Sequence, residues 1–206
     1  MKTWPRLVGL AANILLLVGS IGFAADAPPA RPADTATAIF AGGCFWCIEA
    51  DFEKLPGVIG AESGYTAGNT ANPTYKEVGA GGTGHTEAIR VSYDPAKVSY
   101  QQLVDYFWRH IDPTARDRQF CDAGTQYRSG IYWRNEAERK IAEASRDALL
   151  KSGKLARIHT EIAAASAFYP AEEYHQDYYK KNQIRYAYYR KSCGRDARVR
   201  EIWGDK

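Results

Sequence analysis

The chain has 206 residues, of which 45% are hydrophobic and 25% charged, enough for one packed domain and a targeting segment. Its formal net charge is +3 at pH 7, and Lys2 and Arg6 account for two of its basic residues. This near-neutral balance excludes a protein that binds nucleic acid mainly through its phosphates, because such proteins carry a marked excess of positive charge.

The first 25 residues have the pattern of a secretory signal peptide. Lys2 and Arg6 place positive charge ahead of an apolar run over residues 7–23, and small residues near Ala24 offer a cleavage site. The alternative is a retained membrane anchor, because the run is close to the shortest length that spans a bilayer. We expect cleavage and export, either to the periplasm or out of the cell.

A short lead-in and one domain follow the signal segment. Residues 26–36 are rich in Pro and Ala, which predicts a flexible lead-in rather than part of a core. Residues 37–206 are then a single domain that contains every cysteine of the chain. Because an exported protein meets an oxidising compartment, disulfide bonds between these cysteines are permitted.

Strand and helix patterns are interleaved along this domain. Alternating and β-branched runs predict strands over residues 37–41, 58–65, 87–93, 129–133 and 158–163. Helical spacing and capping residues predict helices over residues 44–55, 99–110, 135–148 and 172–182, and residues 66–84 predict an ordered loop. We therefore expect an α+β fold, a single-domain two-layer sandwich of a mixed sheet and helices, with Cys44 at a strand-to-helix turn.

The segment from Gly42 to Cys47 is the most informative in the chain. A thiol at a helix N-terminus meets free backbone N–H groups and the positive end of the helix dipole, so we expect a lowered pKa for Cys44 and a nucleophilic thiolate. Phe45 and Trp46 can line an apolar pocket beside it. The alternative is a structural pair, with Cys44 and Cys47 bridged for stability and both aromatic rings in the core.

Two other patterns match known kinds of site only weakly. Gly79 to Gly84 fits the GxGxxG spacing of dinucleotide-binding proteins, but a strand rather than a helix is predicted after it. Zinc binding needs about four ligands, yet the chain has one C-x-x-C pair, and its four histidines form no HExxH pattern. We therefore expect neither a bound nucleotide nor a bound metal.

Five ordered segments resemble the motifs of A-type peptide-methionine sulfoxide reductases. They are Gly43-Cys-Phe-Trp46, Ser63-Gly-Tyr65, Asn72-Pro-Thr-Tyr75, Thr83-Gly-His-x-Glu87 and Asp122-x-Gly-Thr-Gln-Tyr-Arg-Ser129. The resemblance runs from about Ile39 to about Asn182. Many family members have Gly where this chain has Cys47, and many have Cys where it has Gly79.

The resemblance implies a mechanism and a set of site residues. Cys44 attacks the sulfur of methionine sulfoxide, preferably the S epimer, free or in proteins, and becomes a sulfenic acid. Glu87 supplies the proton for the sulfoxide oxygen. The residues implied to bind the substrate are Phe45 and Trp46 for the methyl group, and Tyr75, Tyr127 and Asp122 for the oxygen or a nearby water.

The cycle must end with a disulfide that an external reductant opens. We expect Cys193 to resolve the sulfenic acid, because it lies near a C-terminal tail that we predict to be mobile and matches the family's C-terminal resolving cysteine. Cys47 and Cys121 are alternatives. The reductant is a thioredoxin-like dithiol, no bound cofactor is needed, and we expect a monomer.

Two other functions are compatible with parts of the sequence. One is a thioredoxin-like disulfide oxidoreductase that uses Cys44 and Cys47, although Phe45-Trp46 and the later motifs argue against it. The other is a non-enzymatic, disulfide-stabilised binding module with an aromatic surface. Activity toward methionine sulfoxide would distinguish the reductase from both.

Overall fold

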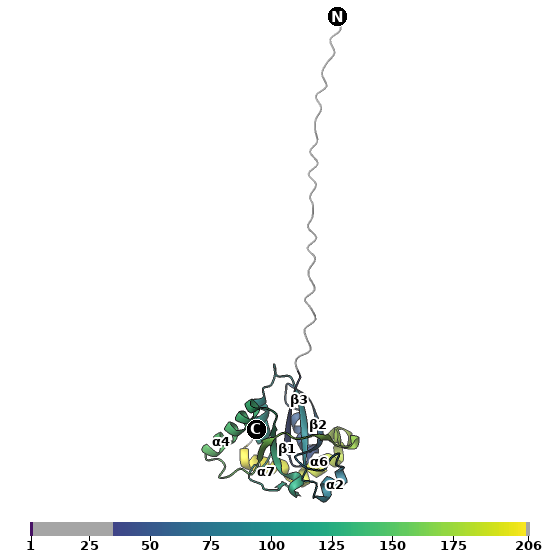
Figure 1. Cartoon of the computed structure of the whole chain (residues 1–206), viewed down its shortest axis with the longest axis vertical. Helices are drawn as coiled ribbons and strands as arrows, with labels where there is room; N and C mark the ends of the chain where they lie inside the picture. The colour runs from purple at the N-terminus through teal and green to yellow at the C-terminus, as the bar shows by residue number, and fades with distance from the viewer. Residues whose placement is uncertain (2–34, 205–206) are drawn as a thin grey trace. The chain divides into compact units, whose positions relative to one another are not determined.

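The computed structural model describes Met1 and residues 35–204 (Figure 1). The predicted signal peptide, apart from Met1, and the predicted lead-in, apart from its last two residues, lie outside this range. In the part of the chain that the structure describes, no helix combines the length and apolar composition needed to cross a membrane.

A mixed six-stranded sheet forms one layer of the fold, in the order β7-β6-β1-β3-β2-β8. Neighbouring strands are antiparallel, apart from the parallel pair β6 and β7. The strands are β1 (Ala36–Gly42), β2 (Val58–Thr66), β3 (Thr86–Tyr93), β6 (Ser129–Trp133), β7 (Glu161–Ala164) and β8 (Tyr169–Pro170). A separate small ribbon pairs β4 (Arg118–Gln119) with β5 (Asp122–Ala123).

Helices make up the second layer. They are α1 (Phe45–Phe52), α2 (Tyr75–Ala80), α3 (Tyr100–Trp108), α4 (Glu136–Lys151), α5 (Tyr178–Lys181), α6 (Gln183–Ser192) and α7 (Arg195–Trp203), with short 3-10 turns at Thr125–Tyr127 and Glu173–His175. Ser99 caps α3 by accepting a hydrogen bond from the Gln102 backbone N–H, and Asn135 caps α4 in the same way. These local signals end up where the sequence predicts them.

The main core lies between β1 and the helices α1 and α3. Phe40 on β1 packs against Phe52 of α1 and Phe107 of α3, with ring centroids 5.0 and 5.2 Å apart. The alternate residues Ile39 and Ala41 belong to a smaller cluster on the other face of the sheet. This alternation follows from the two-residue period of a strand, and it confirms the expected α+β sandwich.

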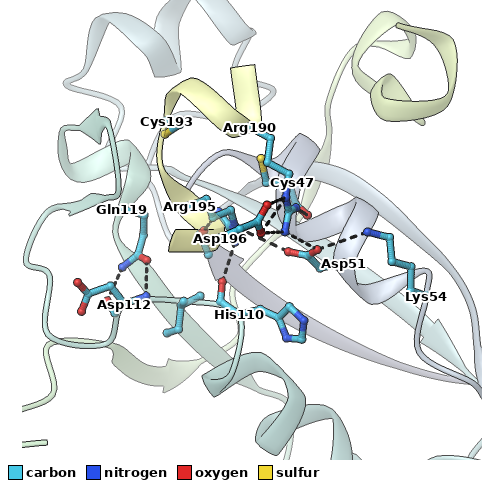
Figure 2. A network of polar contacts seen from close by, with 12 residues as sticks. Cys47, Asp51, Lys54, His110, Asp112, Gln119, Arg190, Cys193, Arg195 and Asp196 are labelled. Atoms are coloured by element: carbon cyan, nitrogen blue, oxygen red, sulfur yellow. Dashed lines mark hydrogen bonds and ion pairs between the residues drawn. The ribbon is translucent and has the colours of Figure 1, made fainter. Parts of the chain in front are cut away.

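The C-terminal region differs from the prediction of a mobile tail. Residues 183–203 form the helices α6 and α7, joined at Gly194, whose φ of 71° suits a helix-to-helix junction. Arg195 and Trp203 of α7 are buried against the rest of the domain. The sequence has only a weak helical pattern here. Long-range contacts of charged and aromatic side chains, rather than local signals, hold these helices in place, and Figure 2 shows those of Arg195.

The predicted loop over residues 66–84 also contains more structure than expected. Thr74 begins α2 with a capping box, in which its hydroxyl accepts from the Glu77 N–H and the Glu77 carboxylate accepts from the Thr74 N–H. This short helix carries Tyr75. The predicted helix over 172–182 is instead a 3-10 turn followed by the single-turn α5.

Candidate active site

Cys44 lies at the turn between β1 and α1, as predicted. It is the N-cap residue of α1, and its carbonyl accepts the backbone N–H of Cys47 at 3.1 Å. Gly43 before it has a φ of 79°, and a Cβ there would lie 2.4 Å from the Cβ of buried Gln119. Glycine is therefore required at this position both for the backbone conformation and for the close packing.

A small pocket opens over Cys44. Its volume is about 80 Å³, much less than the several hundred Å³ of a typical small-molecule site, so it suits the end of one side chain. Its lining residues come from six separate parts of the chain: Cys44, Phe45, Trp46, Tyr75, Glu87, Asp122, Tyr127 and Tyr189. All of the predicted substrate-binding residues, with Cys44 and Glu87, are thus brought together.

Glu87 is the buried acid of this pocket. It projects from β3, only 3% of its surface is exposed, and its Oε2 accepts the Phe45 backbone N–H at 2.9 Å. Burial raises the pKa of Glu87 to about 8, against the opposing effect of that hydrogen bond. At neutral pH the carboxyl group is therefore mostly protonated and able to donate a proton.

Two tyrosines face the same space. Burial, with Glu87 nearby, raises the pKa of Tyr75 to about 12 and raises the pKa of Tyr127 still further. Both phenols are consequently hydrogen-bond donors at any physiological pH. Their hydroxyl groups and the Glu87 carboxyl form the polar side of the pocket.

Aromatic rings form the other, apolar side of the pocket. Trp46 stacks on Tyr178 with ring centroids 3.7 Å apart and an interplanar angle of 7°. Its indole N–H donates to Nδ1 of His175 at 3.0 Å, and burial lowers the pKa of His175, which keeps that nitrogen an acceptor. The indole ring is therefore fixed in orientation beside Phe45, so the apolar wall is preorganised.

Tyr189 is a pocket residue that the sequence analysis missed. Its hydroxyl donates to Oδ2 of Asp122 at 2.5 Å and also contacts the thiol of Cys44. It reaches the pocket from α6, beyond the last helix that the sequence predicts. The only signal for it is the high density of tyrosines near the C-terminus, which does not single out one of them.

The electrostatics of Cys44 differ from the expectation of a lowered pKa. Burial raises the pKa of its thiol well above the usual value, and the neighbouring Cys47 and Glu87 add to this effect. The hydrogen bond from Tyr189 opposes it. Removal of the sulfur from water thus outweighs the helix N-terminus, and Cys44 rests as a thiol in hydrogen-bond contact with Cys47.

The four cysteines fall into two pairs. Cys121 and Cys193 form a disulfide, whereas Cys44 and Cys47 are free and buried. The bridge lies next to the pocket, because Asp122 directly follows Cys121. The prediction that Cys193 lies on a mobile tail is wrong. Its predicted resolving role stays a prediction, and in this structure its sulfur is bonded to Cys121.

A free thiol, a protonated carboxyl and phenol donors around a pocket of side-chain size are groups that a thiol-dependent reductase of an oxygen-bearing side chain requires. The family model described as "Peptide methionine sulfoxide reductase" matches residues 36–206. The chain belongs to this family, and it is a thiol-dependent enzyme that reduces methionine sulfoxide.

Similar proteins match between about three quarters and nearly all of the chain. Peptide methionine sulfoxide reductase MsrA 2 of Caulobacter vibrioides is 48% identical over 199 residues, covering 97% of this chain and 98% of the relative. The MsrA of Bacillus pumilus is 50% identical and covers 82% and 96%. Among solved structures, methionine sulfoxide reductase A of Corynebacterium diphtheriae has a TM-score of 0.66 at 39% identity and covers 75% and 78%. Reduced Mxr1 of Saccharomyces cerevisiae has a TM-score of 0.68 at 35% identity and covers 74% and 88%.

Proposed function

We propose that Cys44 is the nucleophile and Glu87 the proton donor in reduction of the S epimer of methionine sulfoxide, free or within proteins. The observation that carries this assignment is the pocket itself, where the thiol and a carboxyl with a pKa of about 8 face one small space. The resemblance of the motifs to A-type enzymes supports the choice of epimer.

The proposed first step transfers the sulfoxide oxygen to Cys44. The methyl group contacts Phe45 and Trp46, while Tyr75 and Tyr127 donate hydrogen bonds to the oxygen. Glu87 protonates that oxygen as its negative charge grows, and the Cys44 sulfur attacks the sulfoxide sulfur.

The Cys44 proton must leave during this attack. Cys47 accepts the hydrogen bond of the Cys44 thiol and is therefore placed to take the proton. The bond between the two sulfurs then breaks as the hydroxyl group that carries the sulfoxide oxygen bonds to the Cys44 sulfur, so methionine departs and Cys44 is left as a sulfenic acid. Asp122 and Tyr189 are hydrogen-bonded to each other at the edge of the pocket. This pair orients the hydrogen-bond donors around the sulfoxide oxygen.

The remainder of the proposed cycle is thiol chemistry. A second cysteine condenses with the sulfenic acid, which releases water and forms a disulfide. A thioredoxin-like protein with a reactive dithiol then reduces that disulfide by exchange. Each of these steps uses side chains of this chain and an external dithiol.

We further propose that the enzyme acts outside the cytoplasm, in the periplasm or after secretion. The charged start, the apolar run and the small residues before residue 25 support this location. The disulfide between Cys121 and Cys193 is consistent with it, because such bonds persist in oxidising compartments.

The test of the proposed function is turnover of methionine sulfoxide with dithiothreitol as reductant. We expect the wild-type chain to form methionine and the Cys44→Ser variant to form none, because no other group in the pocket is a comparable nucleophile. Circular dichroism should show that the variant is folded. Methionine formation by folded Cys44→Ser at more than a trace rate would disprove the assignment.

A further inference from the structure

The pocket over Cys44 is too small to hold a whole substrate. Its volume of about 80 Å³ is less than that of about three molecules of liquid water, at about 30 Å³ each. Only the end of a methionine sulfoxide side chain fits inside. The backbone of the substrate, and the neighbouring residues of a polypeptide, must therefore lie on the surface around the pocket mouth.

An exposed aromatic ring lies beside this mouth. Tyr174 belongs to the 3-10 turn Glu173–His175 and is 58% exposed, although it is a large and partly apolar side chain. Its ring centroid is 4.2 Å from that of His175, which in turn is 4.3 Å from that of Tyr75. Because Tyr75 lines the pocket, these rings form a row that begins in the pocket wall and ends in solvent.

The electrostatics agree with a position close to the pocket wall. Burial is the main reason why the pKa of Tyr75 rises to about 12, and Tyr174 is one of the neighbours that raise it further. Partial burial and Glu172 also raise the pKa of Tyr174. Its phenol is therefore uncharged at physiological pH, and the ring offers an apolar face with a polar edge.

The turn that carries this ring is fixed on both sides. The Glu172 carboxylate accepts the Tyr65 hydroxyl at 2.8 Å and the Tyr75 backbone N–H at 2.9 Å. The side-chain amide of Gln176 accepts the Ser63 N–H at 2.8 Å and donates to the Ser63 carbonyl oxygen at 2.9 Å. Because the backbone of the turn is already ordered, a contact with the exposed ring costs little conformational entropy.

We propose that Tyr174 is a docking platform for the polypeptide on either side of methionine sulfoxide, and that it favours substrates with an apolar residue next to the oxidised methionine. This inference rests on the proposed function, which places the sulfoxide in the pocket. When the sulfoxide enters, the neighbouring apolar side chain packs on the exposed ring, and both lose contact with water. Free methionine sulfoxide has no such neighbour and cannot gain this contact.

Steady-state kinetics with three substrates test the proposal. Two blocked tripeptides carry methionine sulfoxide between two leucines or between two glycines, and free methionine sulfoxide is the reference. We expect kcat/KM of the wild type to be higher for the leucine tripeptide than for the glycine tripeptide by about fivefold or more. The difference should lie in KM, because the contact is the same before and during the chemical step. Equal values of kcat/KM for the two tripeptides would overturn the proposal.

Variants of the exposed ring assign the preference to Tyr174. Tyr174→Ala removes the ring and should bring the leucine-to-glycine ratio of kcat/KM close to one, whereas Tyr174→Phe keeps the ring and should keep the ratio. The matched control is Tyr188→Ala, because Tyr188 is a tyrosine with 75% exposure on α6, outside this row of rings. It should keep the wild-type ratio. An unchanged ratio in Tyr174→Ala would exclude Tyr174 as the platform.

A purely structural role for Tyr174 gives a different result. If the ring only supported the pocket wall, Tyr174→Ala would lower kcat/KM by the same factor for all three substrates, and this outcome would also overturn the proposal. Circular dichroism should show that the variant is folded, as we expect for a substitution at an exposed position.

Free methionine sulfoxide separates failure of this proposal from failure of the proposed function. A wild-type chain that reduces all three substrates with the same kcat/KM would refute the role of Tyr174 and leave the proposed function standing. A wild-type chain that forms methionine from none of them would refute the proposed function, and the role of Tyr174 with it.

Discussion

Glu87 shows how one residue acquires its chemistry from its surroundings. Its carboxyl is removed from water on β3 and accepts one backbone N–H, that of Phe45. Because burial disfavours the charged form, the pKa rises to about 8, and the group carries a proton at neutral pH. The same residue on the protein surface would be ionised and unable to act as an acid.

Replacing this acid should slow the chemical step. We expect Glu87→Gln to reduce the rate of methionine formation in a single turnover by about 10²–10⁴-fold, the usual contribution of a positioned acid. The amide keeps the shape and removes the proton. Reduction of the preformed enzyme disulfide by dithiothreitol is the control and should be unchanged. A wild-type rate of methionine formation would assign the proton to another group.

The pH dependence of methionine formation by the wild type and by Glu87→Gln tests the same assignment. Glu87 is protonated below about pH 8 and loses its proton as the pH rises through that value. The ratio of the wild-type rate to the Glu87→Gln rate should therefore decline above about pH 8. Burial, the largest cause of the raised pKa of Cys44, is common to both proteins, so the ratio reduces the contribution of the Cys44 titration. A ratio that stays constant from pH 6 to pH 10 would contradict the assignment.

Tyr189 connects the nucleophile to the opposite edge of the pocket. Tyr189→Phe removes the hydrogen bond that lowers the pKa of Cys44 and leaves Asp122 without this donor. A hydrogen bond to a charged group is worth about 1.5–3 kcal/mol, so we expect single-turnover methionine formation to fall by about tenfold or more. Tyr188→Phe, one residue away and exposed on the same helix, is the matched control. Equal rates in the two variants would exclude Tyr189 from the site.

At the scale of elements, α6 and α7 complete the site from the far end of the chain. Arg195 donates to the carbonyl oxygens of Gly42 and His110 at 3.1 and 2.9 Å, so α7 holds the end of β1 two residues before Cys44. Its guanidinium also lies 4.6 Å from the centre of the Phe120 ring. The position of the nucleophile therefore depends on helices that follow it by about 150 residues.

The Cys121–Cys193 bridge joins these helices to the strand ribbon that carries Asp122. It links residues 72 positions apart, and cross-links of this kind contribute about 2–4 kcal/mol to the free energy of unfolding. We expect the Cys121→Ser/Cys193→Ser double variant to be less stable than the oxidised wild type by about this amount in guanidinium unfolding. Added reductant should destabilise the wild type and leave the double variant unchanged. Equal free energies of unfolding for the two proteins without reductant would show that the bridge does not stabilise the fold.

At the scale of the whole molecule, the N-terminal segment predicts where the enzyme works. We expect the chain isolated from the periplasm or culture medium to begin near residue 25, and N-terminal sequencing of that fraction measures this. A variant with Lys2 and Arg6 replaced by glutamate should remain inside the cell, because the positive start of the signal segment is lost. Uncleaved chains confined to the cytosol in the wild type would contradict export, though not the chemistry.

Features set by neighbours along the chain could be predicted from the sequence. The capping pair Ser99 and Gln102 and the positive φ of Gly43 act within a few residues, so the helix start and the turn that they form do not depend on the rest of the fold. The pocket residues Tyr75, Glu87, Asp122 and Tyr127 were identified as a group only through their order and their family resemblance. Their individual sequence context is that of ordinary loops and strands.

The tertiary structure alone decided the electrostatics and the pairing of the cysteines. The pKa of Cys44 depends on burial by segments remote in sequence, and this burial reverses the effect expected of a helix N-terminus. Tyr189, Arg190 and Arg195 meet the Cys44 turn across more than 140 residues, a distance over which residue spacing carries no information. The sequence by itself determined the family and the local turns and predicted the nucleophile, because each motif and each turn is a short-range pattern. Which charges and thiols meet was decided only by long-range packing, because burial and Coulomb interactions depend on distances in space.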